Sequence, residues 1–278
     1  MRNIRPLLKD CLPPIVLRTV AQILGSGTRF EGNYSSWEEA ATQCGGYAAE
    51  NILTKVLDAT LKVKQGDAAF ERDSVAFHDI EYNWPVLAAF LWAASRNAGF
   101  LNVLDFGGAL GSSYFQNRRF LETLRKVSWN VIEQPHYVRA GKEHIQDERL
   151  RFYLTIDSYM TENQPNVILL SSVLQYLPNP FNVLDKLAKC GASCLIIDRT
   201  PYSSQAEDCL VIQHVPSNIY RASYPMWIFS WDRFVQHITD SWEIFASHIC
   251  PEGYVKTDHR QDFSFKGMLL SSKQCSKN

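Results

Sequence analysis

The sequence predicts an α/β protein with a doubly wound, mostly parallel sheet of seven strands and an N-terminal helical cap. Between about residues 35 and 98 the apolar residues recur at helical spacing, whereas from residue 100 short apolar runs alternate with helical stretches. These runs are apolar throughout, as expected for parallel strands that are covered on both faces. Two further apolar runs near the C-terminus bring the expected number of strands to seven.

Each expected strand corresponds to one apolar run, and the expected helices lie between the runs. The strands are expected at 101–106, 129–133, 150–155, 167–173, 194–198, 242–247 and 266–271. Helices are expected near 112–126, 135–146, 180–189 and 231–238. Sheets of this kind bind ligands outside the carboxyl ends of the strands, where the strand order reverses.

The N-terminal part, residues 1–98, is expected to form a helical cap on a second domain at 99–278. Serines followed three residues later by glutamates, at 35–39, are typical of a helix N-terminal cap. Gly66 ends a second helical pattern, and Pro85 suits the first turn of a third.

Composition and charge exclude several function classes. The net charge is −1 at pH 7, so nothing suggests nucleic-acid binding by bulk electrostatics, and a small molecule is the expected partner. The seven cysteines are odd in number and scattered, without Cys-x-x-Cys spacing and without a histidine beside them in a metal-ligand pattern. We therefore expect reduced thiols, no metal and a cytoplasmic protein.

The first 29 residues are locally basic and carry apolar residues between the charges. Their longest uncharged run, 11–17, is too short and too rich in proline to span a bilayer, and no signal-peptide cleavage site follows. One interpretation is a helix that packs on the domain. The other is a basic amphipathic segment that makes peripheral contact with the anionic inner face of the membrane.

The candidate cofactor site is the loop after the first strand of the sheet. Asp105 is followed by Gly107, Gly108 and Gly111, and a helix pattern begins directly afterwards. Glycines let the backbone turn sharply and approach a ligand, and the helix N-terminus offers free N–H groups. An acidic residue here would repel a pyrophosphate but can pair with an ammonium group, such as that of S-adenosylmethionine. The alternative is a tight turn between strand and helix.

Two further carboxylates are candidates for the same site. Glu133 ends the second strand, where a carboxylate can accept hydrogen bonds from both ribose hydroxyls, as in dinucleotide-binding folds. Asp157 follows the third strand, at a position from which it could meet the adenine edge. For Asp157 the alternative is an N-cap for the following turn.

The order and spacing of these features resemble class I S-adenosylmethionine-dependent methyltransferases, whose fold is Rossmann-like. The glycine loop, Glu133, the segment 169–177 and the closing strand pair carry the resemblance, with Ala109 where the family has its middle glycine. The resemblance implies S-adenosyl-L-methionine as the cofactor. More narrowly, the chain resembles a methyltransferase family of bacterial surface-polysaccharide gene clusters, through segments 34–40, 71–77, 105–111, 133–135, 174–178, 198–201 and 224–225.

The acceptor is expected over the carboxyl ends of the strands, beneath the segment from Asp198 to Ser230. Methyl transfer is a direct displacement, so the protein mainly aligns the acceptor, and a base helps when the acceptor is a hydroxyl. His214 is the candidate base by intrinsic pKa, and Asp198 is the alternative because it ends a strand. The alternative for His214 is a structural role, which is the more frequent one for a lone histidine between apolar residues, and the alternative for Asp198 is a pairing with Arg199 alone.

Six residues are expected to bind the acceptor. Two come from a polar stretch of the cap at 71–83, which could instead be a solvated run of charges. The others lie after strands of the sheet, or in an aromatic segment that is either a sugar-stacking wall or the underside of a lid. The six are Arg72, Asp73, Gln175, Tyr176, Arg199 and Tyr224.

Three functions remain open on the sequence. The first is methyl transfer from S-adenosylmethionine to a hydroxyl of a saccharide or other small metabolite, in surface-polysaccharide biosynthesis. The second is a non-catalytic binding protein that keeps the fold. The third is a nicotinamide-dependent oxidoreductase, which the acidic residue before the glycines and the lack of a Gly-x-Gly-x-x-Gly pattern disfavour.

Overall fold

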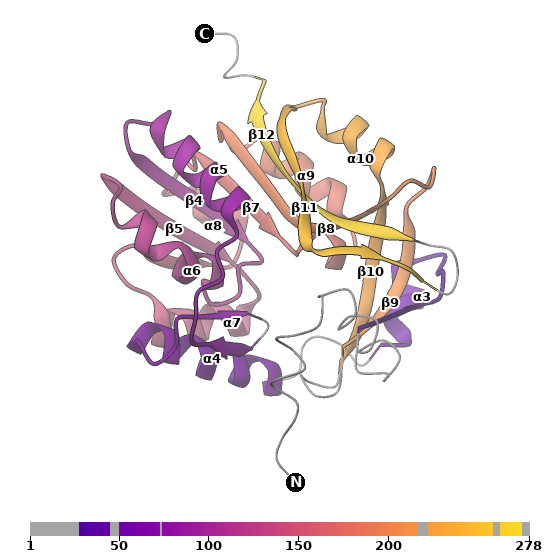
Figure 1. Cartoon of the computed structure of the whole chain (residues 1–278), viewed down its shortest axis with the longest axis horizontal. Helices are drawn as coiled ribbons and strands as arrows, with labels where there is room; N and C mark the ends of the chain where they lie inside the picture. Colours follow the sequence, from indigo (N-terminus) through magenta and orange to yellow (C-terminus); the bar gives the residue numbers. More distant parts are fainter. Residues whose placement is uncertain (1–27, 45–49, 73, 216–221, 258–261, 274–278) are drawn as a thin grey trace, which may run out of the picture.

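The computed structural model describes residues 28–44, 50–72, 74–215, 222–257 and 262–273. Its core is a sheet with helices on both faces (Figure 1). Within the described residues, seven strands follow one another in the order β6-β5-β4-β7-β8-β12-β11, and β12 alone runs antiparallel to the other six. This confirms the predicted fold class. The strands are β4 (Phe100–Phe106), β5 (Lys126–Ile132), β6 (Leu150–Tyr153), β7 (Val167–Ser171), β8 (Cys194–Ser203), β11 (Trp242–Val255) and β12 (Phe263–Ser272).

The strand order reverses beside β4, which lies between β5 and β7. From β4 the chain adds β5 and β6 on one side, and it then returns to add β7 and β8 on the other. The carboxyl ends of β4 and β7 therefore meet at the topological switch point, where doubly wound sheets bind ligands. The glycine loop follows β4 directly, so it lies at that point.

Alternating side chains of the strands pack under helices on the two faces. Val103 belongs to one apolar cluster and Leu104 to the other, and both are fully buried. The first cluster includes residues of α4 (Glu50–Gln65), α5 (Trp84–Ser95), α6 (Ser112–Leu121) and α7 (Pro135–Ala140), which continues as a π-helical turn, Gly141–Ile145. The second includes residues of α8 (Ile156–Met160), α9 (Pro180–Ala188) and α10 (Trp231–Ile238).

The cap begins as predicted and then departs from the prediction. Ser36 caps α3 (Trp37–Thr42), and the carboxylate of Glu39 accepts hydrogen bonds from the backbone and hydroxyl of Ser35. Gly66 ends α4 with a φ of 89°. The polar stretch contains a hairpin that was not predicted, β2 (Phe70–Arg72) paired with β3 (Val75–Phe77), because strands of three residues leave too short a pattern to read.

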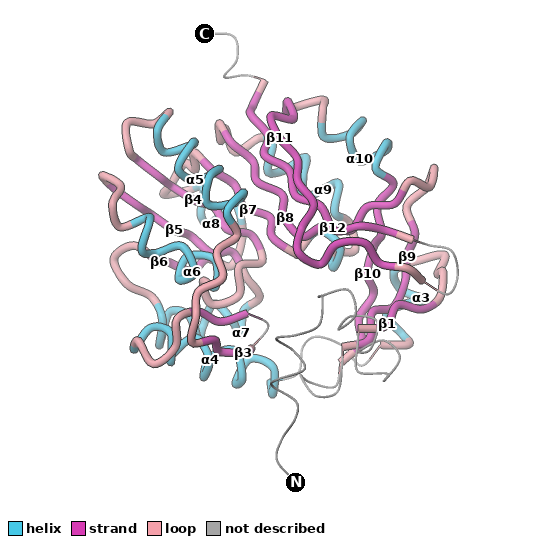
Figure 2. Tube along the Cα trace, viewed as in Figure 1, coloured by secondary structure: helices cyan, strands magenta, loops and turns pink. Residues whose placement is uncertain are grey.

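The segment after β8 contains strands that were not predicted. It forms β9 (Cys209–His214) and β10 (Ser223–Ser230), an antiparallel pair that β1 (Arg29–Glu31) joins on its outer edge. We call β1, β9 and β10 the ribbon. The last residues of β8 and β10 pair with each other, so the ribbon joins the sheet at the end of β8 (Figure 2). α3 packs on β9 and β10, so the described part of the predicted cap contacts the ribbon as well as the sheet.

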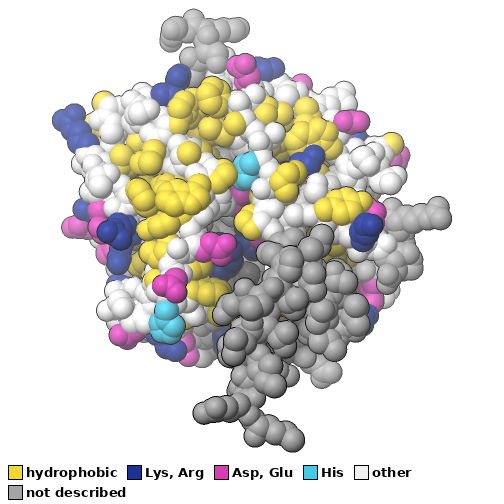
Figure 3. Space-filling model, viewed as in Figure 1, with side chains coloured by type: hydrophobic (Ala, Val, Ile, Leu, Met, Phe, Trp, Pro, Cys, Tyr) yellow, Lys and Arg dark blue, Asp and Glu magenta, His cyan; other side chains and the backbone are white. Residues whose placement is uncertain are grey.

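One face of the molecule displays apolar side chains over α5 and the β11–β12 pair (Figure 3). Trp84 and Phe245 are both 60% exposed. Trp92 stacks on Phe245 with ring centroids 4.9 Å apart, which joins α5 to the edge strand β11. Among the described residues, no helix is both long enough and apolar enough to cross a bilayer. The basic N-terminal segment proposed as a membrane contact lies outside the described residues, except for its last two positions.

Candidate functional site

The glycine loop has a backbone that only glycine allows at two positions. Gly107 has a φ of 75°, and a Cβ there would lie 2.4 Å from Cγ2 of Val173. Gly111 has a φ of 92°, and its Cβ would lie 2.9 Å from Cδ2 of Leu150. The amide of Gly107 donates to the carbonyl of Ile132, which fixes the loop against the end of β5. Both glycines are therefore required by conformation and by space.

Ala109 stands at a position whose backbone also favours glycine. Its φ is 50°, in the left-handed region that costs an L-residue about 1–2 kcal/mol. Three non-glycine residues with positive φ lie on three neighbouring strands or directly after them, at the switch point or beside it: Ala109 after β4, Ser172 after β7 and Arg199 within β8. Strain of this kind collects at functional sites, so its concentration at this edge supports the location of the site.

Asp105 lies beneath the loop and is 1% exposed. Its Oδ2 accepts a hydrogen bond from Nε1 of Trp129 at 2.9 Å, and a Cβ on Gly108 would overlap the carboxylate. Burial raises the pKa of Asp105 to about 7; the Trp129 N–H opposes this rise and the charge of Glu133 adds to it. The predicted pairing of Asp105 with an ammonium group stays a prediction. In this structure the carboxylate that would form the pair is shielded from water.

Glu133 follows β5 and reaches the glycine loop. Its Oε1 accepts from the amide of Ala109 at 3.3 Å, and its Oε2 accepts from the amide of Gln134 at 2.7 Å. Burial raises the pKa of Glu133, although both backbone amides act in the opposite direction. The sequence placed this carboxylate at the loop, and the contact with Ala109 agrees with that placement. Its bond to ribose stays a prediction.

Asp157 lies on α8 and is not its N-cap. Thr155, two residues earlier, is the N-cap and exchanges hydrogen bonds with Ser158, so the alternative interpretation of Asp157 as the cap is wrong. The Asp157 carboxylate forms an exposed ion pair of 2.7 Å with Lys186 of α9. Its contact with adenine stays a prediction.

The cap hairpin reaches the start of α6. The buried Glu71 accepts a hydrogen bond from the hydroxyl of Ser112, the first residue of α6 and the neighbour of Gly111. Arg72 places its guanidinium over the ring of Phe70, 5.6 Å from the centroid. Asp73 lies outside the described residues. The hairpin thus contributes to the loop through Glu71, a residue that the sequence analysis did not select.

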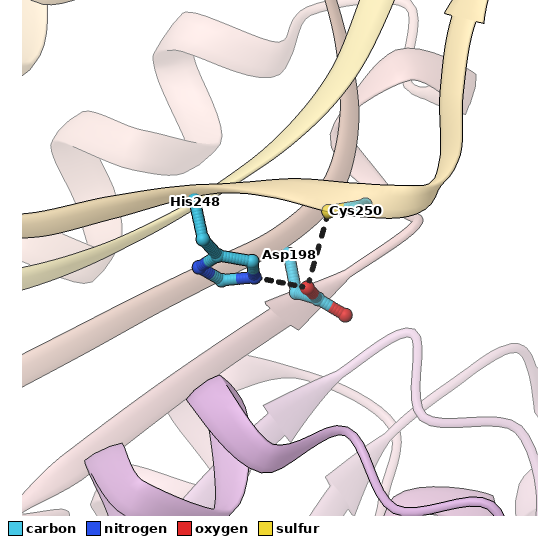
Figure 4. Close-up of side chains that lie close together, drawn as sticks. All are labelled: Asp198, His248 and Cys250. Atoms are coloured by element: carbon cyan, nitrogen blue, oxygen red, sulfur yellow. Dashed lines mark hydrogen bonds and ion pairs between the residues drawn. The ribbon is translucent and has the colours of Figure 1, made fainter.

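Asp198 of β8 is the centre of a buried polar cluster (Figure 4). Its Oδ2 accepts hydrogen bonds from Nδ2 of Asn83 at 2.9 Å and from Oγ of Ser171 at 3.1 Å. Its Oδ1 lies 3.4 Å from Nε2 of His248 and 3.5 Å from Sγ of Cys250. We call these five residues the Asp198 cluster. It joins the N-cap of α5 and the end of β7 to β8 and β11.

The neighbours of Asp198 stabilise the negative charge of its carboxylate. Burial acts to raise the pKa of Asp198, but the hydrogen bond from His248, the charge of Arg199 and the amide of Asn83 outweigh it, and the net pKa is lowered. Asp198 is therefore ionised at neutral pH. Arg199 does not rely on Asp198 for its own ion pair, because its Nε lies 2.7 Å from Glu252 of β11.

Three other predicted acceptor residues come together beside β8. Gln175, in the 3₁₀ turn Leu174–Tyr176, is fully buried and donates to the carbonyl of Arg199 and the hydroxyl of Ser172. Tyr176 packs edge-on against Tyr224 of β10, with ring centroids 5.0 Å apart. The hydroxyl of Tyr176 donates to Gln213 of β9, which ties the turn to the ribbon.

His214 lies at the end of β9 and forms an ion pair of 2.9 Å with Glu31 of β1. Its register partners are Arg29 of β1 and Ser223 of β10, so it belongs to the ribbon. The structure thus separates the two candidate bases: Asp198 contacts the end of β7 at the switch edge, whereas His214 is held by the outer strand. The catalytic role of His214 stays a prediction.

Several residues of the site were missed by the sequence analysis. Asn83 and Ser171 carry no motif of their own. His248 and Cys250 did offer a signal, since residues two apart on a strand point to the same face. The sequence analysis did not select this pair as metal ligands, although Asp198, His248 and Cys250 place three ligand atoms within 4.8 Å of one another.

No protein-family model matches the chain, and no curated protein matches its sequence. Similar solved structures include the N-terminal domain of EvdMO1 in the presence of SAH and D-fucose, with 11% identity and a TM-score of 0.49 over 82% of this chain and 100% of that chain. Another is the 1,6-didemethyltoxoflavin-N1-methyltransferase of Burkholderia thailandensis, with 16% identity and a TM-score of 0.40 over 82% and 92% of the two chains. The N-methyltransferase NodS of Bradyrhizobium japonicum has 15% identity and a TM-score of 0.41 over 70% and 89%. Likeness at this level concerns the arrangement of helices and strands only.

Proposed function

We propose that the chain binds S-adenosylmethionine at the glycine loop and transfers its methyl group to a hydroxyl of a saccharide or other small metabolite. One observation carries the proposal. A glycine loop with the left-handed backbone of Gly107 and Gly111 lies at the switch point, and the carboxylate of Glu133, from the next strand, contacts it. This is the combination of a close backbone approach and a ribose acceptor that nucleoside cofactors require.

The charges of the loop favour a cationic cofactor over a dinucleotide. Asp105 and Glu133 are two carboxylates of the same loop region, close enough for Glu133 to raise the pKa of Asp105. A pyrophosphate would add negative charge beside them, which costs free energy at low dielectric. S-adenosylmethionine instead brings an ammonium and a sulfonium group. When bound, it supplies the electrophilic methyl group, and this chain's residues position the two reactants.

The acceptor would lie over the end of β7, where β8 continues past it. Ser171 and Asp198 meet there, and Gln175, in the turn that follows β7, donates to the carbonyl of Arg199, the neighbour of Asp198. The Oε1 of Gln175 is buried and has no hydrogen-bond partner among the described residues. An unsatisfied buried oxygen costs about 1–3 kcal/mol, which a donor from a bound molecule or water would recover. A hydroxyl acceptor is such a donor.

A base is needed once the acceptor is a hydroxyl. Of the two candidates, Asp198 is better placed, because it is ionised and contacts the end of β7, whereas His214 is paired with Glu31 on the ribbon. The saccharide nature of the acceptor and a role in surface-polysaccharide biosynthesis are supported by the sequence resemblance through segments such as 71–77 and 198–201.

A non-catalytic binding protein of the same fold is the second candidate. The observation that favours it is the burial of Asp198, whose side chain is only 2% exposed and has four neighbours on its two oxygens. A carboxylate in this state reaches an acceptor only if the site rearranges. This candidate shares the cofactor site with the first and differs in turnover alone.

Calorimetry of the full chain with S-adenosylmethionine, S-adenosylhomocysteine and NAD tests the cofactor. We expect binding of the first two and none of NAD. Gly107→Ala should abolish that binding, because its Cβ would overlap Val173, whereas Gly66→Ala is the matched control with a similar positive φ and open space. Binding of NAD, or normal S-adenosylmethionine binding by folded Gly107→Ala, would overturn the proposal. Transfer of a labelled methyl group to extracted glycans separates the enzyme from the binding protein.

A further inference from the structure

Three side chains of the Asp198 cluster present three different ligand atoms to one another. His248 and Cys250 lie two residues apart on β11 and so point to the same face, and Asp198 comes from β8, two strands away. The imidazole nitrogen, the thiol sulfur and the carboxylate oxygen all lie within 4.8 Å of one another (Figure 4). This arrangement is made by two strands of the sheet and is independent of the glycine loop.

Two of the three separations match those between ligands of one metal ion, and both also lie within hydrogen-bond reach. The Asp198 oxygen and the His248 nitrogen are 3.4 Å apart, beyond the usual range of about 2.7–3.2 Å for N–H···O bonds. Around a tetrahedral zinc ion, bond lengths of about 2.0–2.3 Å place oxygen and nitrogen ligands about 3.3–3.4 Å apart, and oxygen and sulfur ligands about 3.5–3.6 Å apart. The observed separation between Asp198 and Cys250 is 3.5 Å.

Gly267 of β12 leaves the space in which these groups meet. It is the register partner of His248, and it is skipped in the pairing of β12 with β8. A Cβ at this position would lie 2.4 Å from Nε2 of His248 and 3.1 Å from Oδ1 of Asp198. Gly267 is not among the residues with positive φ, so its backbone does not require glycine. The ring of His248 occupies the space that a Cβ would need, so glycine at this position lets the imidazole lie beside Asp198.

The surroundings of the cluster also suit an ion. Asn83 and Ser171 hold Oδ2 of Asp198, which orients Oδ1 toward His248 and Cys250, as outer-shell partners of metal ligands do. A carboxylate and a thiolate together cancel the charge of a divalent cation, so the loaded site is neutral and tolerates burial. The side chain of His248 is 23% exposed, which provides a path for entry.

We propose that Asp198, His248 and Cys250 bind a zinc ion with three protein ligands. A mixed oxygen, nitrogen and sulfur set is typical of zinc, and three protein ligands leave a fourth position for water or a bound hydroxyl. The site does not depend on the proposed methyl transfer. The zinc site does affect the proposed mechanism of methyl transfer, because an Asp198 that coordinates the ion is not free to act as the base.

The test uses the full chain, treated with a chelator and kept reduced. Zinc titrated against a chromophoric competitor should bind at one ion per chain, and cobalt should give the near-ultraviolet sulfur-to-cobalt absorption of a thiolate ligand. Cys250→Ser should abolish that absorption, and His248→Gln should weaken zinc binding by more than tenfold. Asn83→Ser, which removes an outer-shell partner, should weaken it by about 10–100-fold.

Matched controls lie elsewhere in the chain. Cys190, also buried, donates to the Lys186 carbonyl, and His237 pairs with Asp185 on the opposite face of the sheet. Cys190→Ser and His237→Gln should bind zinc as the wild type does. Thermal unfolding shows whether each variant is folded. No thiolate absorption with cobalt in the wild type would overturn the proposal and leave the three residues as a hydrogen-bonded group, as would unchanged zinc affinity in folded His248→Gln.

Discussion

The indole N–H of Trp129 donates to the carboxylate of Asp105 at 2.9 Å, and both side chains are removed from water beneath the glycine loop. An ionised carboxylate in this position is costly, which is why the pKa of Asp105 rises to about 7. An apolar residue or an amide at this position would destabilise the folded state less. The acid therefore reduces stability at a site where it can serve binding, a trade-off common at functional positions.

The first prediction is that Asp105→Asn stabilises the protein in a pH-dependent way. The folded-state pKa of about 7 lies above the unfolded value of 3.8, so the unfolded state loses this proton first as pH rises. Stability is therefore lost between about pH 4 and 7, by up to about 4 kcal/mol at 1.36 kcal/mol per pKa unit. Asn keeps an acceptor for Trp129 and does not titrate.

Urea unfolding of wild type and variant at several pH values measures this difference. The advantage of Asp105→Asn should be large at pH 8 and should shrink as pH falls toward 4. Asp147→Asn, at a position without the same burial, serves as the control. A constant difference between wild type and Asp105→Asn across the range would show that Asp105 does not titrate in the folded protein near neutrality.

The second prediction concerns Ala109, where glycine suits the backbone better. At a φ of 50° the strained backbone of alanine lowers the stability of the folded state by about 1–2 kcal/mol. Glycine removes this strain, but it lowers stability by about 0.4–1 kcal/mol because it gives the unfolded chain more conformational entropy. The first effect is the larger, so Ala109→Gly should raise the free energy of unfolding by about 0.5–1 kcal/mol. Chemical denaturation measures it. Ala188→Gly, at the end of a helix, should instead destabilise the protein.

The sheet and the loop could be predicted because both leave local patterns. Each of the seven strands contains a short apolar run, and Asp105 to Gly111 is a contiguous motif. The ribbon leaves a weaker pattern. Its outer strand, β1, has three residues, and it pairs Arg29 with His214 across most of the chain. No local periodicity encodes such a pairing.

The Asp198 cluster escaped prediction for a related reason. Asp198 was selected because it ends a predicted strand, but its partners come from three other segments. Asn83 could be assigned only as a helix cap. His248 and Cys250 fell at the edge of the expected strand 242–247, which the structure extends to Val255, so their shared face was not considered. Long-range contacts decide these positions, and a single sequence does not report them.

The third prediction separates the two roles of Asn83. This residue caps α5 and donates to Asp198. Asn83→Ser keeps a capping oxygen, but its shorter side chain does not reach Asp198, so the substitution should cost about 1.5–3 kcal/mol, the value of a hydrogen bond to a charged group. Asn83→Ala loses the cap as well and should cost about 1 kcal/mol more. Equal stabilities of Asn83→Ser and wild type would contradict the hydrogen bond to Asp198.

The fourth prediction concerns ribose recognition. Glu133→Ala should weaken binding of S-adenosylmethionine by about 1–3 kcal/mol, because a charge-assisted hydrogen bond to the sugar is lost. Calorimetry measures the change. Glu133→Gln keeps an oxygen for the amide of Ala109. This variant therefore tests the charge-assisted bond to ribose without removing the contact with the loop. Glu148→Ala, whose side chain is 85% exposed, is the control. Unchanged affinity in Glu133→Ala would reduce Glu133 to a residue that supports the loop.

The fifth prediction is that cofactor binding releases a proton from Asp105. A cation bound near this carboxylate stabilises its ionised form and lowers its pKa from about 7. Affinity for S-adenosylmethionine should therefore rise with pH up to about 7 and level off above it. Calorimetry near pH 6.5, in buffers with different ionisation enthalpies, counts the protons released, and Asp105→Asn should release none.

S-adenosylhomocysteine keeps the ammonium group and lacks the sulfonium charge. Equal release with both ligands would assign the effect to the ammonium group, as the loop position of Asp105 predicts. A heat of binding that does not depend on the buffer would place the cofactor's positive charges away from Asp105.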